Sequence, residues 1–164
     1  HHQLDLRIRE TGAQSALSLQ TRTNLGALYM RAGEFVPARD ELGPAVSGAA
    51  GLGAGGLSLL AHARTYFGFT LAQLGDFEES ARQSALAQSE AATSVGPKHP
   101  TYANLMGTWA ESAMVRGQPE DAMVLAREAA ELTRELLGDA HPDAMRAAER
   151  VEAFARGSMP TQPR

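Results

Sequence analysis

Histidines and carboxylates are the side chains in this sequence that could carry out chemistry. The chain has five histidines, nineteen acidic residues and no cysteine, so disulfides, thiolate nucleophiles and cysteine-based zinc sites are excluded. His99 and His141 each precede a proline and are 42 residues apart. In a repeat with that period they would take equivalent places about one repeat apart, too distant to share a metal ion. We expect each imidazole to cap or pack against a linker before a helix.

The remaining candidates for catalysis have simpler structural explanations. His62 has no second metal-ligating residue near it in the sequence. The pairs Glu78-Glu79 and Glu120-Asp121 fall in expected first helical turns, where the helix dipole favours acidic side chains. No strained strand-to-helix turn is available to activate a serine. The sequence therefore predicts no catalytic residue, no metal site and no cofactor, and we expect a protein that is not an enzyme.

The segment at residues 51–56 formally matches the G-x-G-x-x-G pattern. A dinucleotide site would need a strand before this segment and an acidic residue about 20 positions after it. A helix is expected before it instead, and no Gly-Lys-Ser/Thr follows. We expect a linker that can act as a hinge between helical units.

Composition and charge limit the class of protein further. Hydrophobic residues make up 43% and charged residues 21% of 164 residues, which is typical of one soluble globular domain. A net charge of -4 disfavours nucleic acid as a partner. The sequence has no apolar stretch of about 18 residues and no signal peptide, so we expect no membrane contact and a cytoplasmic protein. His1-His2 are either native or the remainder of a purification tag.

Two landmarks recur with a period of 42 residues. Gly96–Pro100 recurs as Gly138–Pro142, and Gly33–Phe35 recurs as Gly75–Phe77, with Gly117 one further period on. Apolar residues within each unit have helical spacing. Small residues occupy the same three places in each unit, where they would let two antiparallel helices approach closely. These small residues are Gly26, Ala38 and Ala45, then Gly68, Ser80 and Ala87, then Ala110, Ala122 and Ala129.

The residues around the small ones, which include a glycine at the turn, keep the same order, more loosely in the third unit. The accompanying residues are Leu25, Tyr29, Gly33 and Leu42 in the first unit, Phe67, Leu71 and Gly75 in the second, and Trp109, Ala113, Gly117 and Ala126 in the third. This arrangement resembles the tetratricopeptide repeat, with Ser84 departing from it in a bulky place of the second unit. The 42-residue period and the Leu-Gly-x-x-His-Pro linker at residues 137–142 resemble the kinesin-light-chain-like subclass, which is widespread in bacterial signalling proteins.

The resemblance implies an all-α fold, a right-handed α-solenoid of antiparallel helix pairs with about seven to eight helices. We expect a single array at residues 1–157. Residues 3–12 would form the end of the second helix of a preceding repeat. Residues 142–156 would form the first helix of a last, incomplete repeat. A flexible tail would follow at 158–164. We expect the array to begin and end partway through a repeat, as a fragment of a longer protein would. The repeats themselves are expected at residues 15–50, 57–95 and 100–137.

The resemblance also implies a non-catalytic scaffold that binds a peptide or protein segment on the concave face formed by the first helices of the pairs. Asn24 and Asn104 would hold the backbone of an extended peptide, Tyr66 and Phe69 would anchor an apolar side chain, and arginines would favour an acidic segment. The predicted groove residues are Asn24, Met30, Arg31, His62, Thr65, Tyr66, Phe69, Gln73, Asn104, Thr108, Glu111, Arg146 and Arg150.

Two alternatives stay open at this point. The array could self-associate through its ends, each of which would expose a helix face that a neighbouring repeat normally covers. The segment could instead regulate a larger signalling protein, such as a kinase or an ATPase.

Overall fold

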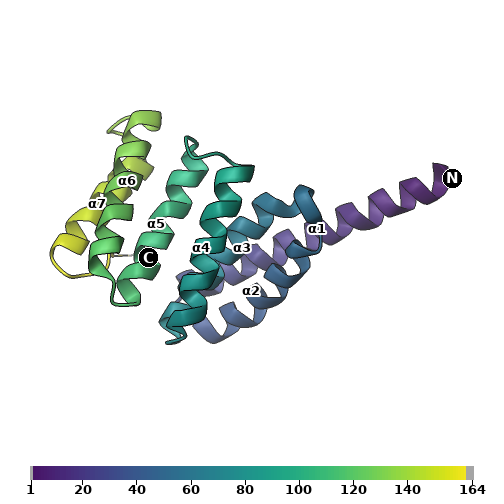
Figure 1. The fold of residues 1–164 in the computed structure, drawn as a ribbon, viewed down its shortest axis with the longest axis horizontal. Helices are drawn as coiled ribbons and strands as arrows, with labels where there is room; N and C mark the ends of the chain where they lie inside the picture. Colours follow the sequence, from purple (N-terminus) through teal and green to yellow (C-terminus); the bar gives the residue numbers. More distant parts are fainter. Residues whose placement is uncertain (1, 162–164) are drawn as a thin grey trace.

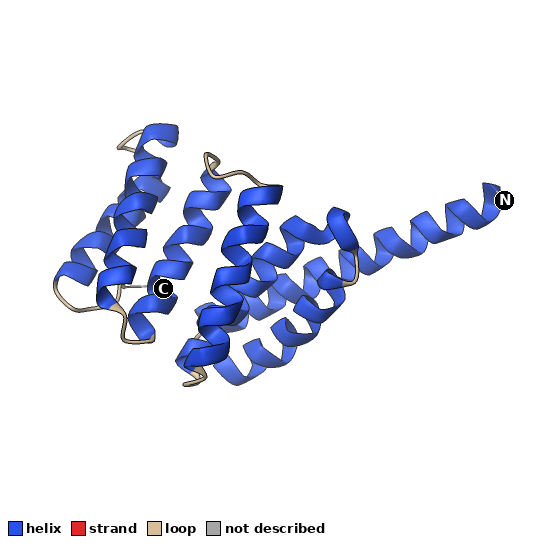
Figure 2. Cartoon of the chain, in the orientation of Figure 1, coloured by secondary structure: helices blue, strands red, loops and turns tan. Residues whose placement is uncertain are grey.

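The structure is a computed structural model that describes the backbone of residues 2–161 and the side chains of residues 15–161. This part of the chain contains no strand (Figure 2). It forms a short 3-10 helix, η1 (Gly53–Gly56), and seven α-helices, which confirms the all-α expectation. The α-helices are α1 (His2–Arg31), α2 (Phe35–Ala50), α3 (Leu57–Gln73), α4 (Phe77–Ser94), α5 (Pro100–Val115), α6 (Pro119–Leu137) and α7 (Pro142–Ala155).

Neighbouring helices pack in a repeat pattern. The helix pairs are α1 with α2, α3 with α4, and α5 with α6, and α7 packs on α6. The first helices of successive pairs also contact one another, α1 with α3, α3 with α5 and α5 with α7. Figure 1 shows the pairs side by side in one row, with the N-terminal part of α1 projecting from its end. This packing is that of a helical-repeat solenoid, in which each unit contacts its neighbours.

Side-chain caps define where several helices begin. The Asp76 carboxylate accepts a hydrogen bond from the backbone N–H of Glu79 at 3.4 Å, as a capping residue should. Nδ1 of His99 accepts a hydrogen bond from the backbone N–H of Thr101, and Nδ1 of His141 accepts one from the backbone N–H of Asp143, each at 3.1 Å. The expected capping role of these two histidines is confirmed.

Small residues lie at the contacts between helices, as the repeat pattern predicts. The alanines among them have no exposed surface, and Gly26, Gly68 and Ser80 are buried as well. Trp109, which is 1% exposed, is the largest fully buried side chain. A core with few aromatic rings is therefore packed by close approach of helices.

Arg116 compensates for the serine at position 84. Ser84 stands where the repeat pattern has a bulky residue, and the guanidinium of Arg116 reaches this place from the end of α5. Its Nη1 donates to Ser80 Oγ at 3.0 Å and to Ser84 Oγ at 3.4 Å. Burial lowers the pKa of Arg116, and the charge of Asp121 partly offsets that effect. A long side chain and two hydroxyls thus replace an apolar contact.

The helices differ from the expected ones near the N-terminus. Residues 3–12, expected to end a separate preceding helix, continue without a break into α1, which is 30 residues long. The sequence around Gly12 has no proline to end a helix, and one interior glycine costs only about 1 kcal/mol. The side chains of residues 2–14 and the end of the expected tail, residues 162–164, lie outside the part that the structure describes.

Candidate binding groove

A groove runs along the first helices α1, α3, α5 and α7 and ends against residues that follow α7. Its cavity volume is about 920 Å³, within the usual range for ligand sites in proteins. Most of the predicted residues line it. They are Met30, Arg31, His62, Tyr66, Asn104, Thr108, Glu111, Arg146 and Arg150. Because these residues come from four helices, the groove exists only in the assembled array.

One wall of the groove is aromatic. The His62 and Tyr66 rings meet edge to face with centroids 6.4 Å apart. His62 Nδ1 lies 2.8 Å from the Ser58 carbonyl oxygen, so Nδ1 carries the proton and Nε2 is the acceptor in the neutral ring. Burial raises the pKa of Tyr66, and the nearby charge of Arg31 partly offsets this effect. Tyr66 is therefore a neutral hydroxyl at physiological pH.

An ion pair ties α7 to α5 beside the groove. Arg150 Nε donates to Glu111 Oε1 at 2.8 Å, and the two side chains are only 18% and 14% exposed. The guanidinium lies over Gly107, where an added Cβ would come within 2.5 Å of Arg150 Nη1. The absence of a side chain at position 107 thus lets Arg150 reach its partner.

The charges of the groove are nearly balanced. Three arginines and two glutamates line it. Arg150 is paired with Glu111, and Arg146 is paired with Asp143. Among the described residues Arg31 forms no ion pair, while Glu149 adds an exposed carboxylate. The predicted preference for an acidic segment therefore rests on Arg31 alone.

Thr65 and Phe69 do not face the groove, so their prediction as surface residues is wrong. Thr65 is completely buried, and its Oγ1 accepts a hydrogen bond from Trp109 Nε1 at 2.8 Å. Phe69 is 3% exposed and meets the Phe35 ring edge to face at 6.3 Å. Helix α3 has neighbours on several sides, so more of its surface is buried than a helix at the array end would bury.

Two further predicted residues are exposed but lie outside the groove. Asn24 accepts a hydrogen bond from Gln20 Nε2 at 3.1 Å, one turn away on the same helix. Gln73 is the last residue of α3. Neither side chain lines the cavity. The groove is therefore shorter along α1 and α3 than the sequence predicts.

The structure adds residues that sequence reasoning missed. Thr101 and Leu105 line the groove from α5, and Pro160 and Thr161 line it from the segment after α7. Helical spacing could have identified the first two, because Thr101 is three residues before Asn104 and Leu105 is three residues before Thr108, and residues three or four apart share a face. No sequence signal indicates that the last two return to the groove.

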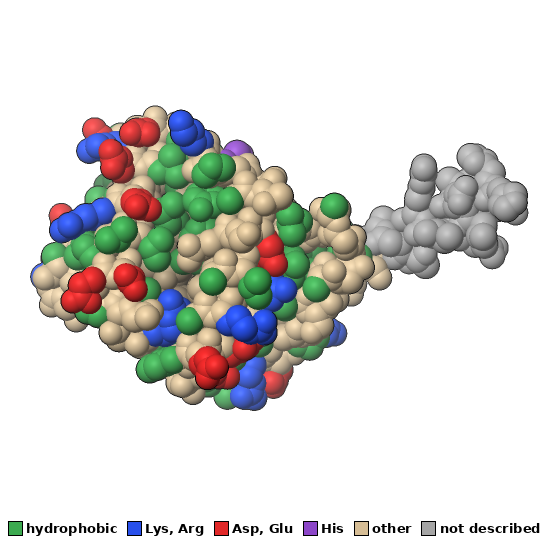
Figure 3. Space-filling model, in the orientation of Figure 1, with side chains coloured by type: hydrophobic (Ala, Val, Ile, Leu, Met, Phe, Trp, Pro, Cys, Tyr) green, Lys and Arg blue, Asp and Glu red, His purple; other side chains and the backbone are tan. Residues whose placement is uncertain are grey.

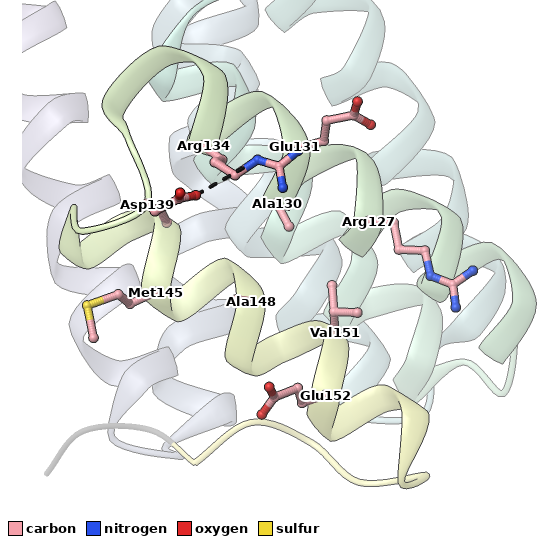
Figure 4. Close-up of a pocket in the computed structure, with 10 residues that line it drawn as sticks. Arg127, Ala130, Glu131, Arg134, Asp139, Met145, Ala148, Val151 and Glu152 are labelled. Carbon is pink, nitrogen blue, oxygen red and sulfur yellow. Dashed lines mark ion pairs between the residues drawn. The ribbon is translucent and has the colours of Figure 1, made fainter.

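A second cavity, of about 700 Å³, lies between α6 and α7 at the end of the array (Figure 4). Arg127 and Glu131 border it from α6, and Val151 and Glu152 from α7. On the face shown in Figure 3, acidic and basic side chains alternate over this end of the molecule.

In the described residues no three metal-ligating side chains gather, and no described helix is long and apolar enough to cross a membrane.

Comparison with known families identifies one stretch of the chain. Residues 110–143 match the family model of the tetratricopeptide repeat. The matched stretch contains all of α6, with the end of α5 before it and the start of α7 after it. No curated protein matches the chain in sequence. The match supports a tetratricopeptide-repeat protein.

Proposed function

We propose that this chain is a non-catalytic scaffold that binds an extended peptide or protein segment in the groove. The observation that carries the proposal is the convergence of aromatic, amide, hydroxyl and charged side chains from four helices on one cavity. Tetratricopeptide repeats generally mediate protein–protein interactions, and solenoids use extended faces of this kind for binding. The proposed partner is therefore a protein segment.

The groove offers a different kind of contact on each side. The Asn104 amide can donate to a peptide carbonyl and accept from a peptide N–H, and the Thr108 hydroxyl can do the same. His62 and Tyr66 offer ring faces and edges for an apolar side chain. Arg31 can bind one carboxylate. We infer a largely neutral segment that carries one acidic group, not a strongly acidic one.

The sequence features support a narrower assignment. On the 42-residue period we propose the kinesin-light-chain-like subclass of the repeat, in a cytoplasmic bacterial signalling protein. A link to a kinase or ATPase domain stays an alternative within this proposal. The sequences that flank this segment in the full-length protein test it directly.

Self-association is the second candidate, and exposed apolar side chains on α1 and α2 favour it. Leu17 is 70% exposed, Leu28 is 59% exposed and Val36 is 49% exposed. Light scattering over a range of concentrations tests this candidate. A mass that rises with concentration and falls back to the monomer in Leu28→Glu would support it, and a monomer throughout would contradict it.

Selection from a displayed library of random peptides tests the scaffold proposal. Selected peptides are synthesised and titrated against the wild type, Arg31→Ala and Asn104→Ala by fluorescence anisotropy. Both side chains are exposed groove residues, so their loss should leave the fold intact. We expect each variant to bind about tenfold more weakly, which corresponds to a loss of about 1.4 kcal/mol.

The control for this experiment is Arg127→Ala, which removes an exposed arginine from α6 outside the groove. It should bind the selected peptides as the wild type does. Equal binding by all four proteins would show that the peptides bind elsewhere and would contradict the assignment of the groove. A library that yields no binding peptide would contradict the proposed function.

A further inference from the structure

The chain reverses its direction directly after α7. Gly157 adopts φ +70°, a left-handed conformation that other residues rarely take. The backbone N–H and the hydroxyl of Ser158 both donate to the Ala153 carbonyl oxygen, at 2.9 Å and 3.0 Å. These two bonds terminate α7 and fix the direction in which the following residues leave it (Figure 1).

The reversal brings the following residues onto the groove. Pro160 and Thr161 line the same cavity as Asn104 on α5 and Arg150 on α7. Pro160 is partly buried there. Through Pro160 and Thr161, the segment at residues 158–161 therefore already contacts the site proposed above for a partner.

The chemistry of this segment suits an extended ligand. Proline has no N–H and a fixed φ, so Pro160 favours an extended backbone whose carbonyls seek donors. Asn104 and Thr108 supply such donors from α5. A second proline follows at position 163 in the sequence. The segment thus resembles the largely neutral, extended peptide that the groove is proposed to bind, without its acidic group.

We propose that residues 158–161 are an intramolecular occupant of the groove, which a partner segment must displace. This proposal rests on the proposed function, because competition requires a partner in the same groove. Only a few residues separate Ala153 from Pro160, so the segment acts at an effective concentration of about millimolar. At that effective concentration even a weak contact is enough to lower a partner's apparent affinity by the fraction of time the groove is occupied.

A spin label tests the position of the segment without any partner. The chain has no cysteine, so Thr161→Cys creates a single attachment site in the full chain. The label should broaden the amide NMR signals of Thr101 and Asn104, whose side chains share the cavity with residue 161. A label at Ser89→Cys, an exposed position on α4, is the control.

Mixing labelled unenriched chain with unlabelled 15N-enriched chain separates contacts within one molecule from contacts between molecules. The proposal is supported if the signals broaden in a sample whose chains carry both the spin label and 15N, and do not broaden in the mixture. Absence of broadening at Thr101 and Asn104, or equal broadening in the mixture, would overturn it.

A binding measurement then tests competition. The probe is a fluorescent peptide with the sequence of residues 156–164, titrated against the wild type and against the full chain carrying Pro160→Gly and Thr161→Gly. We expect the variant to bind the probe at least about threefold more tightly, because its own segment no longer holds the extended form. Equal affinities would contradict the competition.

The results for the two proposals are distinguishable. If the label broadens the α5 signals but no library peptide binds either protein, the intramolecular contact stands and the proposed partner function fails. If library peptides bind wild type and variant equally while broadening is absent, the partner function stands and the intramolecular occupant is overturned.

Discussion

Trp109 Nε1 donates a hydrogen bond to Thr65 Oγ1 across the boundary between two helix pairs, at a distance of 2.8 Å. The Thr65 hydroxyl in turn donates to the Ala61 carbonyl oxygen at 2.8 Å. The Tyr102 ring meets the Trp109 ring edge to face at 5.3 Å, so this indole is held on two sides. A hydroxyl that the sequence assigns to the groove is therefore part of the contact that joins α3 to α5.

Thr65→Val should lower the free energy of unfolding by about 1–3 kcal/mol, because it keeps the volume but leaves the buried Trp109 N–H without an acceptor. Thr65→Ser keeps the hydroxyl and loses one methyl, which costs about 0.8 kcal/mol. Trp109 is the single tryptophan, so urea unfolding can be followed by its fluorescence. A larger loss in Thr65→Ser than in Thr65→Val would show that the hydroxyl does not stabilise the contact.

Gly26→Ala should be destabilising although alanine favours helices. An added Cβ would lie 2.5 Å from Leu42 Cγ, and the Leu42 side chain is fully buried and cannot move away. Overpacking of this kind costs about 1–3 kcal/mol. The matched control is Gly43→Ala on α2, where the nearest atom would be 3.8 Å away and alanine should stabilise by up to about 1 kcal/mol. Thermal unfolding of both variants should show opposite shifts, and shifts of the same sign would contradict this explanation.

Acid should weaken a carboxylate network on α4. Hydrogen bonds from Arg82 and Gln83 lower the pKa of Glu79 to about 2. Its ordinary pKa is about 4.3, so the stability it contributes is complete above that value and is lost as the pH falls towards 2. We expect the melting temperature of Glu79→Gln to lie slightly below that of the wild type at pH 7 and to meet it near pH 2. A difference that does not change with pH would contradict this assignment.

Local features of the fold could be predicted from the sequence because they depend on neighbouring residues along the chain. The caps at Asp76, His99 and His141 require only the few residues around each helix start. The small residues at helix crossings follow from a repeat that imposes the same contact three times. Such patterns can be recognised in the sequence because each element has the same neighbours in every repeat.

The features that could not be predicted depend on side chains that arrive from other repeats. Thr65 and Phe69 have groove spacing but are buried, because Trp109 and Phe35 cover them. The space beside Ser84 is filled by Arg116, which lies at the end of α5 in the next repeat. Most groove residues could be predicted because the resemblance to the tetratricopeptide repeat assigns the concave face to the first helices of the pairs, whereas the return of residues 158–161 has no periodic signal.

The Glu111–Arg150 pair should stabilise the contact between α5 and α7 more than an exposed pair does. Both side chains are mostly buried, so removing either partner leaves a charge with little water around it, at a cost of about 1–3 kcal/mol. In a double-mutant cycle with Glu111→Gln and Arg150→Met, the double variant should lose less stability than the sum of the singles, because the second change removes a charge that the first left unpaired. Urea unfolding of the four proteins measures this coupling energy.

The control cycle uses Arg39 and Asp40, which also form an ion pair but are 47% and 64% exposed. Water and salt screen that pair, so its coupling energy should be at most about 0.5 kcal/mol. Added salt should have little effect on the Glu111–Arg150 coupling energy, because counterions reach a mostly buried pair poorly. Coupling energies that are equal in the two cycles would mean that burial beside the groove does not strengthen the pair, and that α7 is held by its apolar contacts with α5 and α6 alone.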